Sequence, residues 1–188
     1  PLFVYLASPQ YVLSRRPILS AEDFSGQRIR AVGAAPVYVE TLAALGAGSV
    51  ALSLADAMPA MQTGTIDAMI SGLTPFVSFG YYDVATELSE LPGSYLVTVG
   101  IVSKDFLQRI GPELEAVIRE EARKAERAFH DVKTTDLDGA TAEWLARGGA
   151  MHQFDEEASA RYLAVVREVA GEIVAADPAL SDAYAVLS

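Results

Sequence analysis

Residues 28–70 read RIRAVGAAPVYVETLAALGAGSVALSLADAMPAMQTGTIDAMI, a segment that alternates β-rich runs with helical patterns. Its β-rich runs are short and bounded by Gly, Pro or Ser, which is typical of strands. They are residues 28–32, 49–52 and 66–70. Strands that alternate with helices in this order predict parallel strand pairing and an α/β fold class.

The two helices of this segment have recognisable ends. Pro36 suits the first turn of a helix that runs to residue 45, and Gly46 suits its end. Asp56 is a candidate N-cap for the second helix, which Gly64 ends.

The same alternation continues on both sides of the segment. Further strands are expected at residues 2–6, 11–13, 95–102 and 150–154. A long amphipathic helix is expected from Pro112 at least to residue 132, with Glu115–Arg119 and Glu120–Lys124 as i,i+4 ion pairs. Asp155 is expected to cap a last amphipathic helix, which Pro178 ends.

Composition excludes several classes of protein. The chain has 188 residues, 51% of them hydrophobic, and a mean hydropathy of +0.24, so it should fold rather than remain disordered. The net charge of −11 and the lack of a Lys/Arg cluster argue against nucleic acid and against a membrane surface as partners. No apolar stretch approaches the roughly 18 residues of a spanning helix, so no membrane insertion is expected. The chain has no Cys, which removes thiolate metal sites, thiol catalysis and disulfides.

Patterns for a metal, a cofactor or a nucleophile are weak. His130 and His152 are the only histidines, and neither has a second ligand at helical spacing, so no metal is expected. Gly46-Ala47-Gly48 begins like a dinucleotide loop but precedes a strand rather than following one, so no cofactor is expected. No Gly-x-Ser-x-Gly elbow frames a serine nucleophile.

Arg30 is the strongest candidate for a ligand contact. It ends a predicted strand, just before a Gly-containing loop and a helix, where open α/β sheets present groups to ligands. An inward guanidinium there would hold a carboxylate with two parallel N–H···O bonds. The residues alone leave open the alternative of a surface arginine on an edge strand.

Two functions from other classes remain open on the residues alone. A small α/β hydrolase or lyase would use an acidic base, for which Asp67 and Glu40 are the candidates, with Asp56 already assigned to a helix cap. A non-catalytic interaction module would need no such group.

Several blocks of the chain resemble one family. Residues 17–30, PILSAEDFSGQRIR, are similar to the "P-x-x-s-x-x-D-x-x-G-x-k-i-R" segment of the solute-binding proteins of tripartite ATP-independent periplasmic (TRAP) transporters, the DctP-like family. The resemblance continues in order through the blocks LGA at 45–47, LAD at 54–56, AMQTGTIDA at 60–68, YYDV at 81–84 and IGPELEAVI at 110–118.

The resemblance implies a periplasmic receptor that captures a small organic acid and delivers it to TRAP membrane subunits without catalysis. It implies an α/β, periplasmic-binding-protein-like fold of the class II type, with two interleaved lobes, one of them incomplete, and a long connecting helix. By the same resemblance, Arg30 would hold the ligand's carboxylate. Leu54 and Ser71 would line the pocket together with Gly33, Ala34 and Gly72, and Ser71 replaces the family's usual Asn.

The family pattern also implies a division of the chain. Residues 1–96 and 137–188 would form the second ligand-binding lobe, and residues 97–136 the returning part of the first lobe with the long hinge-spanning helix. Family members carry a further N-terminal segment before the part that resembles residues 1–16. The returning part is therefore expected to expose apolar surface.

Overall fold

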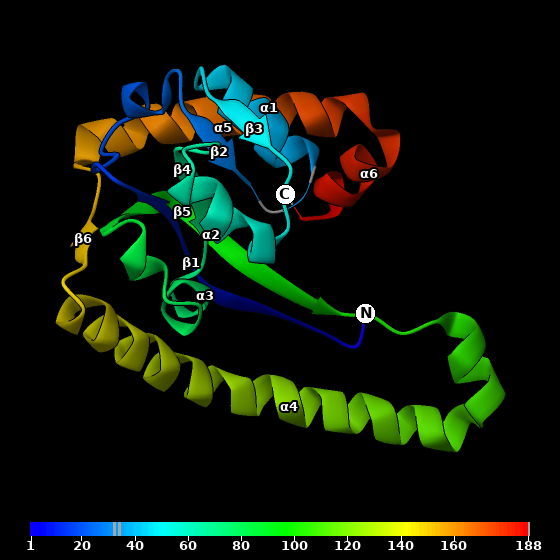
Figure 1. Cartoon of the computed structure of the whole chain (residues 1–188). Coiled ribbons are helices and arrows are strands. Elements are labelled where there is room, and N and C mark those ends of the chain that lie inside the picture. Colours follow the sequence, from blue (N-terminus) through cyan, green and yellow to red (C-terminus); the bar gives the residue numbers. More distant parts are fainter. Residues whose placement is uncertain (32, 34, 188) are drawn as a thin grey trace.

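The computed structural model of the chain describes residues 1–31, 33 and 35–187, with the side chains of all of these except 130–135 and 183–187. The elements in chain order are β1 Phe3–Ser14, η1 Glu22–Phe24, β2 Arg28–Arg30, α1 Pro36–Ala44, β3 Gly48–Val50, α2 Leu54–Gln62, β4 Ala68–Ser71, α3 Leu73–Ser78, η2 Tyr81–Asp83, β5 Glu87–Gly100, α4 Lys104–Ala146, β6 Ala150–His152, α5 Glu156–Ala176 and α6 Pro178–Leu187. The α/β class expected from the alternation is confirmed (Figure 1).

The strands of the described residues form one mixed sheet in the order β3-β2-β4-β1-β5-β6. β2 pairs in parallel with β3 and β4, as the strand–helix alternation predicts. The expectation of parallel pairing is wrong for β1, which runs antiparallel to both β4 and β5. No helix connects β4 and β1 as a crossover, so the parallel rule does not apply to that pair.

β1 and β5 form a ribbon that extends beyond the rest of the sheet (Figure 1). The two strands expected at residues 2–6 and 11–13 are one strand, β1, because Pro9 lies at a register shift rather than at a turn. The strand expected at residues 95–102 is the outer part of β5, which begins at Glu87. Pro92 and Gly93 in the middle of β5 hide this continuity in the sequence.

Helices cover both faces of the sheet, and strand alternation divides the core between them. Val12 of β1 packs with α1 and α5, whereas Tyr11 and Leu13 pack on the opposite face with α2, α3 and Trp144 of α4. We call these the α1/α5 face and the α2/α3 face. Successive side chains of a strand point to opposite faces, so one run of apolar residues supplies both cores.

The helix ends follow the expected chemistry with one correction. Asp155 caps α5 by accepting the backbone N–H of Ala158 at 2.8 Å, as predicted. Asp56 is not the N-cap of α2: Ser53 is, its Oγ accepting the N–H of Asp56 at 3.2 Å and donating to the Asp56 carboxylate at 2.6 Å. A hydroxyl three residues earlier in the chain therefore takes the predicted role.

The long helix begins before its predicted start. α4 runs over Lys104–Ala146 and is broken at Gly111, where φ is +80°, so the helix expected from Pro112 is its second segment. The predicted ion pairs are present, with Arg119 Nη2 at 2.7 Å from Glu115 and Lys124 Nζ at 2.9 Å from Glu120.

Apolar side chains are exposed on the ribbon and on α4, and within residues 97–136 this exposure was expected. The exposed side chains include Val4, Leu6, Val97 and Val99 on the ribbon and Phe106, Leu114 and Val117 on α4. The outer part of β5 pairs with β1.

Candidate functional site

Arg30 lies at the carboxyl end of β2, and its side chain points to the α2/α3 face. Its neighbour Ile29 packs into the α1/α5 face, and strand alternation sends Arg30 to the other side. Its partner in the sheet is Met69 of β4, which belongs to the core of the α2/α3 face. Arg30 is 7% exposed, so the alternative of a surface arginine on an edge strand is wrong.

The guanidinium of Arg30 has no acidic partner among the described residues. Its Nε donates a hydrogen bond to the backbone oxygen of Leu52 at 3.0 Å, and its terminal nitrogens have no partner there. No fully buried side-chain nitrogen or oxygen in the described part lacks a partner, so these terminal nitrogens still reach solvent. Burial lowers the pKa of Arg30 from its usual value, and the Tyr81 phenol opposes that shift. The group remains charged at neutral pH, as arginine does in proteins.

The loop before α2 holds the guanidinium in place. Leu52 accepts the hydrogen bond from Arg30, and Leu54, two residues on, accepts one from the buried Tyr81 hydroxyl at 2.8 Å. Tyr81 therefore fixes the same short segment that orients Arg30. Leu54 itself is half-buried and packs against the core of the α2/α3 face.

Ser71 lies at the same edge and on the same face as Arg30. It is two residues beyond Met69 on β4, so its side chain points to the side on which Arg30 lies. It is 7% exposed, and its hydroxyl has no partner among the described residues.

Gly72 precedes α3 and lies directly against β1. A Cβ at Gly72 would come within 2.7 Å of Ser8 Oγ, so a side chain there would displace Ser8. Gly33, between β2 and α1, is exposed and has a φ of +72°, which favours glycine. Ala34 lies outside the described residues.

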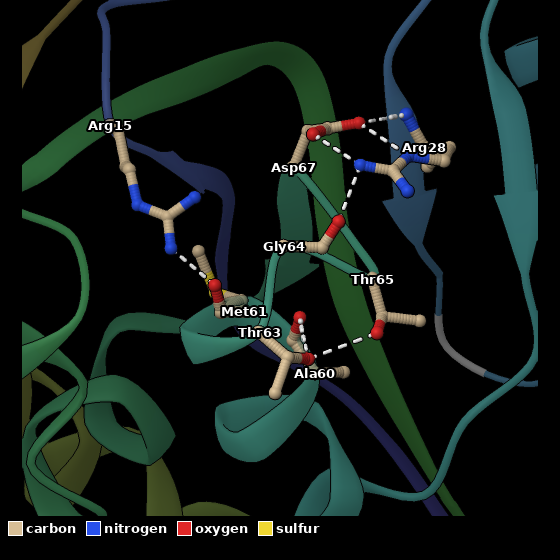
Figure 2. Close-up of polar contacts among 8 residues, drawn as sticks. All are labelled: Arg15, Arg28, Ala60, Met61, Thr63, Gly64, Thr65 and Asp67. Carbon is tan, nitrogen blue, oxygen red and sulfur yellow. Dashed lines mark hydrogen bonds and ion pairs between the residues drawn. The ribbon is translucent and has the colours of Figure 1, made fainter.

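The other end of β2 carries a second arginine in a contrasting environment. Arg28 donates from Nε and Nη2 to both oxygens of Asp67, at 2.9 and 2.8 Å, and Nη2 also donates to the Gly64 carbonyl (Figure 2). Both side chains are substantially exposed. The hydrogen bonds from Arg28 lower the pKa of Asp67 from its usual value.

This pairing weakens the hydrolase or lyase hypothesis. A general base should have a pKa raised toward neutrality, whereas that of Asp67 is lowered and its oxygens are already hydrogen-bonded to Arg28. Asp56 is hydrogen-bonded to Ser53, and Glu40 is exposed on α1. In the part that the structure describes, no three His, Asp or Glu side chains gather where they could hold a metal, and the side chain of His130 lies outside that part.

Sequence reasoning missed the two groups that orient Arg30. The Leu52 carbonyl belongs to the backbone, so no residue type in the sequence indicates its role. Tyr81 lies in a block that resembles the family, but only its hydrogen bond across 27 residues to Leu54 reveals its role.

Comparison with known proteins establishes the family. A sequence profile described as bacterial extracellular solute-binding protein, family 7 (DctP), matches residues 9–177. The chain belongs to this family. A solute-binding protein of Sulfitobacter sp. strain NAS-14.1 is 25% identical over 170 residues, which cover 88% of the chain and 51% of that protein. The family 7 chain thus spans about half the length of the curated relatives it matches.

Solved structures of TRAP solute-binding proteins share the fold. The ectoine-binding protein of the TeaABC TRAP transporter of Halomonas elongata has a TM-score of 0.89 and 20% identity, over 96% of this chain and 60% of that one. A TRAP periplasmic solute-binding protein of Sulfitobacter sp. NAS-14.1, with bound β-D-galacturonate, has a TM-score of 0.86 and 17% identity, over 96% and 59%. The periplasmic-binding-protein-like fold implied by the resemblance is therefore confirmed. Among the described residues of this family 7 chain, no helix combines the length and apolarity needed to cross a bilayer.

Proposed function

We propose that this chain is the ligand-binding part of a periplasmic receptor that holds a small organic acid through Arg30. The observation that carries the proposal is a buried guanidinium with no acidic partner in the described part of the chain. A buried charge without a counterion is costly, and a protein that keeps one has a use for it. A carboxylate would pair with the free terminal nitrogens of Arg30 in the bidentate geometry that arginine favours.

The neighbouring groups suit the rest of such a ligand. The Ser71 hydroxyl lies at the same edge, has no partner among the residues that the structure describes, and would donate or accept one hydrogen bond. Leu54 would offer apolar contact. Gly72 and Gly33 would keep the approach to Arg30 free of bulky side chains.

Capture would use binding without catalysis, with the acid passed unchanged to TRAP membrane subunits. Family membership supports this mechanism, since the family comprises solute-binding proteins. Structural relatives are described as binding galacturonate and ectoine, both of which carry a carboxylate. Residues 1–96 and 137–188 would contribute one lobe and residues 97–136 the returning part of the other. Closure of the lobes would exclude water and strengthen the pair at Arg30.

A direct test is titration of the chain with a panel of sugar acids, including galacturonate, with ectoine, and with galactose, which carries a hydroxymethyl group in place of the galacturonate carboxylate. We expect saturable binding of one or more sugar acids or of ectoine. Galacturonate should bind at least about tenfold more tightly than galactose, because only the acid pairs with Arg30. Equal affinity for the two sugars, or chemical conversion of a bound acid detected by mass spectrometry, would contradict the proposal.

A further inference from the structure

A cavity lies on the α1/α5 face of the sheet, away from the face to which Arg30 points. It measures about 270 Å³, opens to solvent, and is lined mainly by residues of α1, α5 and the strands β1, β4 and β5. Its walls include Leu42 and Ile70, which belong to the core of that face. None of the proposed carboxylate contacts lines it.

Two buried polar side chains line the cavity with hydrogen-bonding capacity unused in the described part. Gln10 is 3% exposed; its Nε2 donates to the Tyr38 hydroxyl at 2.8 Å, and its amide oxygen has no partner. Thr41 is 8% exposed, and its hydroxyl also has no partner. No fully buried side-chain oxygen in that part lacks a partner, so both oxygens keep accessible surface, and the cavity they line provides it. Buried polar groups in proteins normally have a hydrogen-bond partner, so the Gln10 and Thr41 oxygens are suited to bind a polar group that enters the cavity.

Apart from Gln10, Thr41 and Ser94, the lining is mostly aromatic and aliphatic, and it carries no charge. It contains Phe24, Leu91 and Tyr162 and no Asp, Glu, Lys or Arg. Burial raises the pKa of the Tyr162 phenol, so this group stays neutral. A charged ligand would lose its hydration without gaining a counterion, whereas an uncharged one would not.

We propose that this cavity is a second binding site, for a small uncharged molecule with a single ring and one hydroxyl. A dry cavity of about 150 Å³ accommodates benzene, so 270 Å³ admits a ring with a short substituent. The hydroxyl donates to the Gln10 amide oxygen and accepts from Thr41, and the ring packs against Phe24 and Leu91. The occupant also contacts Tyr95, in the middle of β5, and so joins the ribbon to α1 and α5.

The test uses 4-ethylphenol as the probe and 4-ethylbenzoate as its charged counterpart, each titrated into the chain and followed by NMR. We expect saturable shifts with the phenol at residues of α1 and α5, and none there with the benzoate. Thr41→Val keeps the shape of the side chain and removes the hydroxyl, and Gln10→Leu removes the amide. Each should weaken binding of the phenol by about fivefold or more.

Arg30→Ala separates this site from the proposed carboxylate site. It should leave binding of 4-ethylphenol unchanged, since Arg30 faces the other side of the sheet. The proposal is overturned by a lack of saturable phenol binding, by equal binding to the parent, Thr41→Val and Gln10→Leu, or by loss of phenol binding in Arg30→Ala. A failure of organic acids to bind would leave the inference untouched. Thr41→Val, which adds no volume, provides the test if Gln10→Leu does not fold.

Discussion

Arg28 and Arg30 are two residues apart on one strand and have opposite environments. Arg28 is exposed and bound to both oxygens of Asp67, whereas Arg30 is 7% exposed and bonds only to a backbone carbonyl among the described residues. Both side chains point to the same side of β2, so alternation does not separate them. The difference is which end of the strand each occupies and where the acidic partner lies. The environment of Arg28 is that of a structural residue, whereas the environment of Arg30 suits the binding of an anionic ligand.

The contrast between the two arginines is tested most strongly by replacing each with methionine and measuring the free energy of unfolding. Arg30→Met removes a buried charge that has no counterion in the described part of the chain and fills its place with an apolar side chain. We expect the free energy of unfolding to rise by about 1 to 3 kcal/mol in urea denaturation. Arg28→Met breaks an exposed pair and should cause only a slight loss. A clear loss of stability in Arg30→Met would show that Arg30 serves the fold rather than a ligand.

Tyr81→Phe tests whether the orientation of Arg30 depends on the segment 52–54. The change keeps the buried ring and removes the hydrogen bond to the Leu54 carbonyl. We expect a loss of about 1 kcal/mol of stability and a severalfold loss of affinity for the organic acid. The affinity loss should disappear when Tyr81→Phe is combined with Arg30→Ala. An equal loss of affinity when Tyr81→Phe is added to Arg30→Ala would show that Tyr81 does not act through Arg30.

The smallest effect concerns the pair at the other end of β2. The pKa of Asp67 is lowered in the folded state, so its contribution to stability is present above the unfolded pKa, about 3.9, and is lost as the pH falls through the folded value. Asp67→Asn should therefore lower the Tm by a few degrees at most at pH 7, and the difference should shrink below about pH 4. Scanning calorimetry from pH 2.5 to 7 measures this, and a difference that grows toward low pH would contradict the assignment.

Local pattern was enough to find much of this fold. The strand–helix–strand alternation of residues 28–70 predicts the parallel pairs of β2, and Gly46 and Gly64 mark helix ends because their positive φ suits glycine. The antiparallel insertion of β1 between β4 and β5 depends on pairing between residues 54 or more positions apart, such as Ser14 and Ala68, which no local pattern encodes.

The candidate site could be predicted from the sequence only in part, because some of its features depend on contacts between distant residues. The position of Arg30 at a strand end is visible in the sequence, but its lack of a counterion is not. The lack of a counterion in the described part of the chain arises because Asp67 lies beside Arg28 rather than beside Arg30. Arg28 and Asp67 are 39 residues apart in the sequence, so local pattern does not reveal their contact. The support from Leu52 and Tyr81 is equally long-range.

The most direct test of the account is a calorimetric comparison of Arg30→Ala and Arg28→Ala as receptors for the organic acid that the parent binds. We predict that Arg30→Ala loses on the order of 2 to 5 kcal/mol of binding free energy, because the pair between Arg30 and the ligand is buried. Arg28→Ala should retain the parent's affinity to within about twofold, because its charge is exposed and already paired. Unchanged affinity in Arg30→Ala, or equal losses in the two variants, would contradict the central role of Arg30.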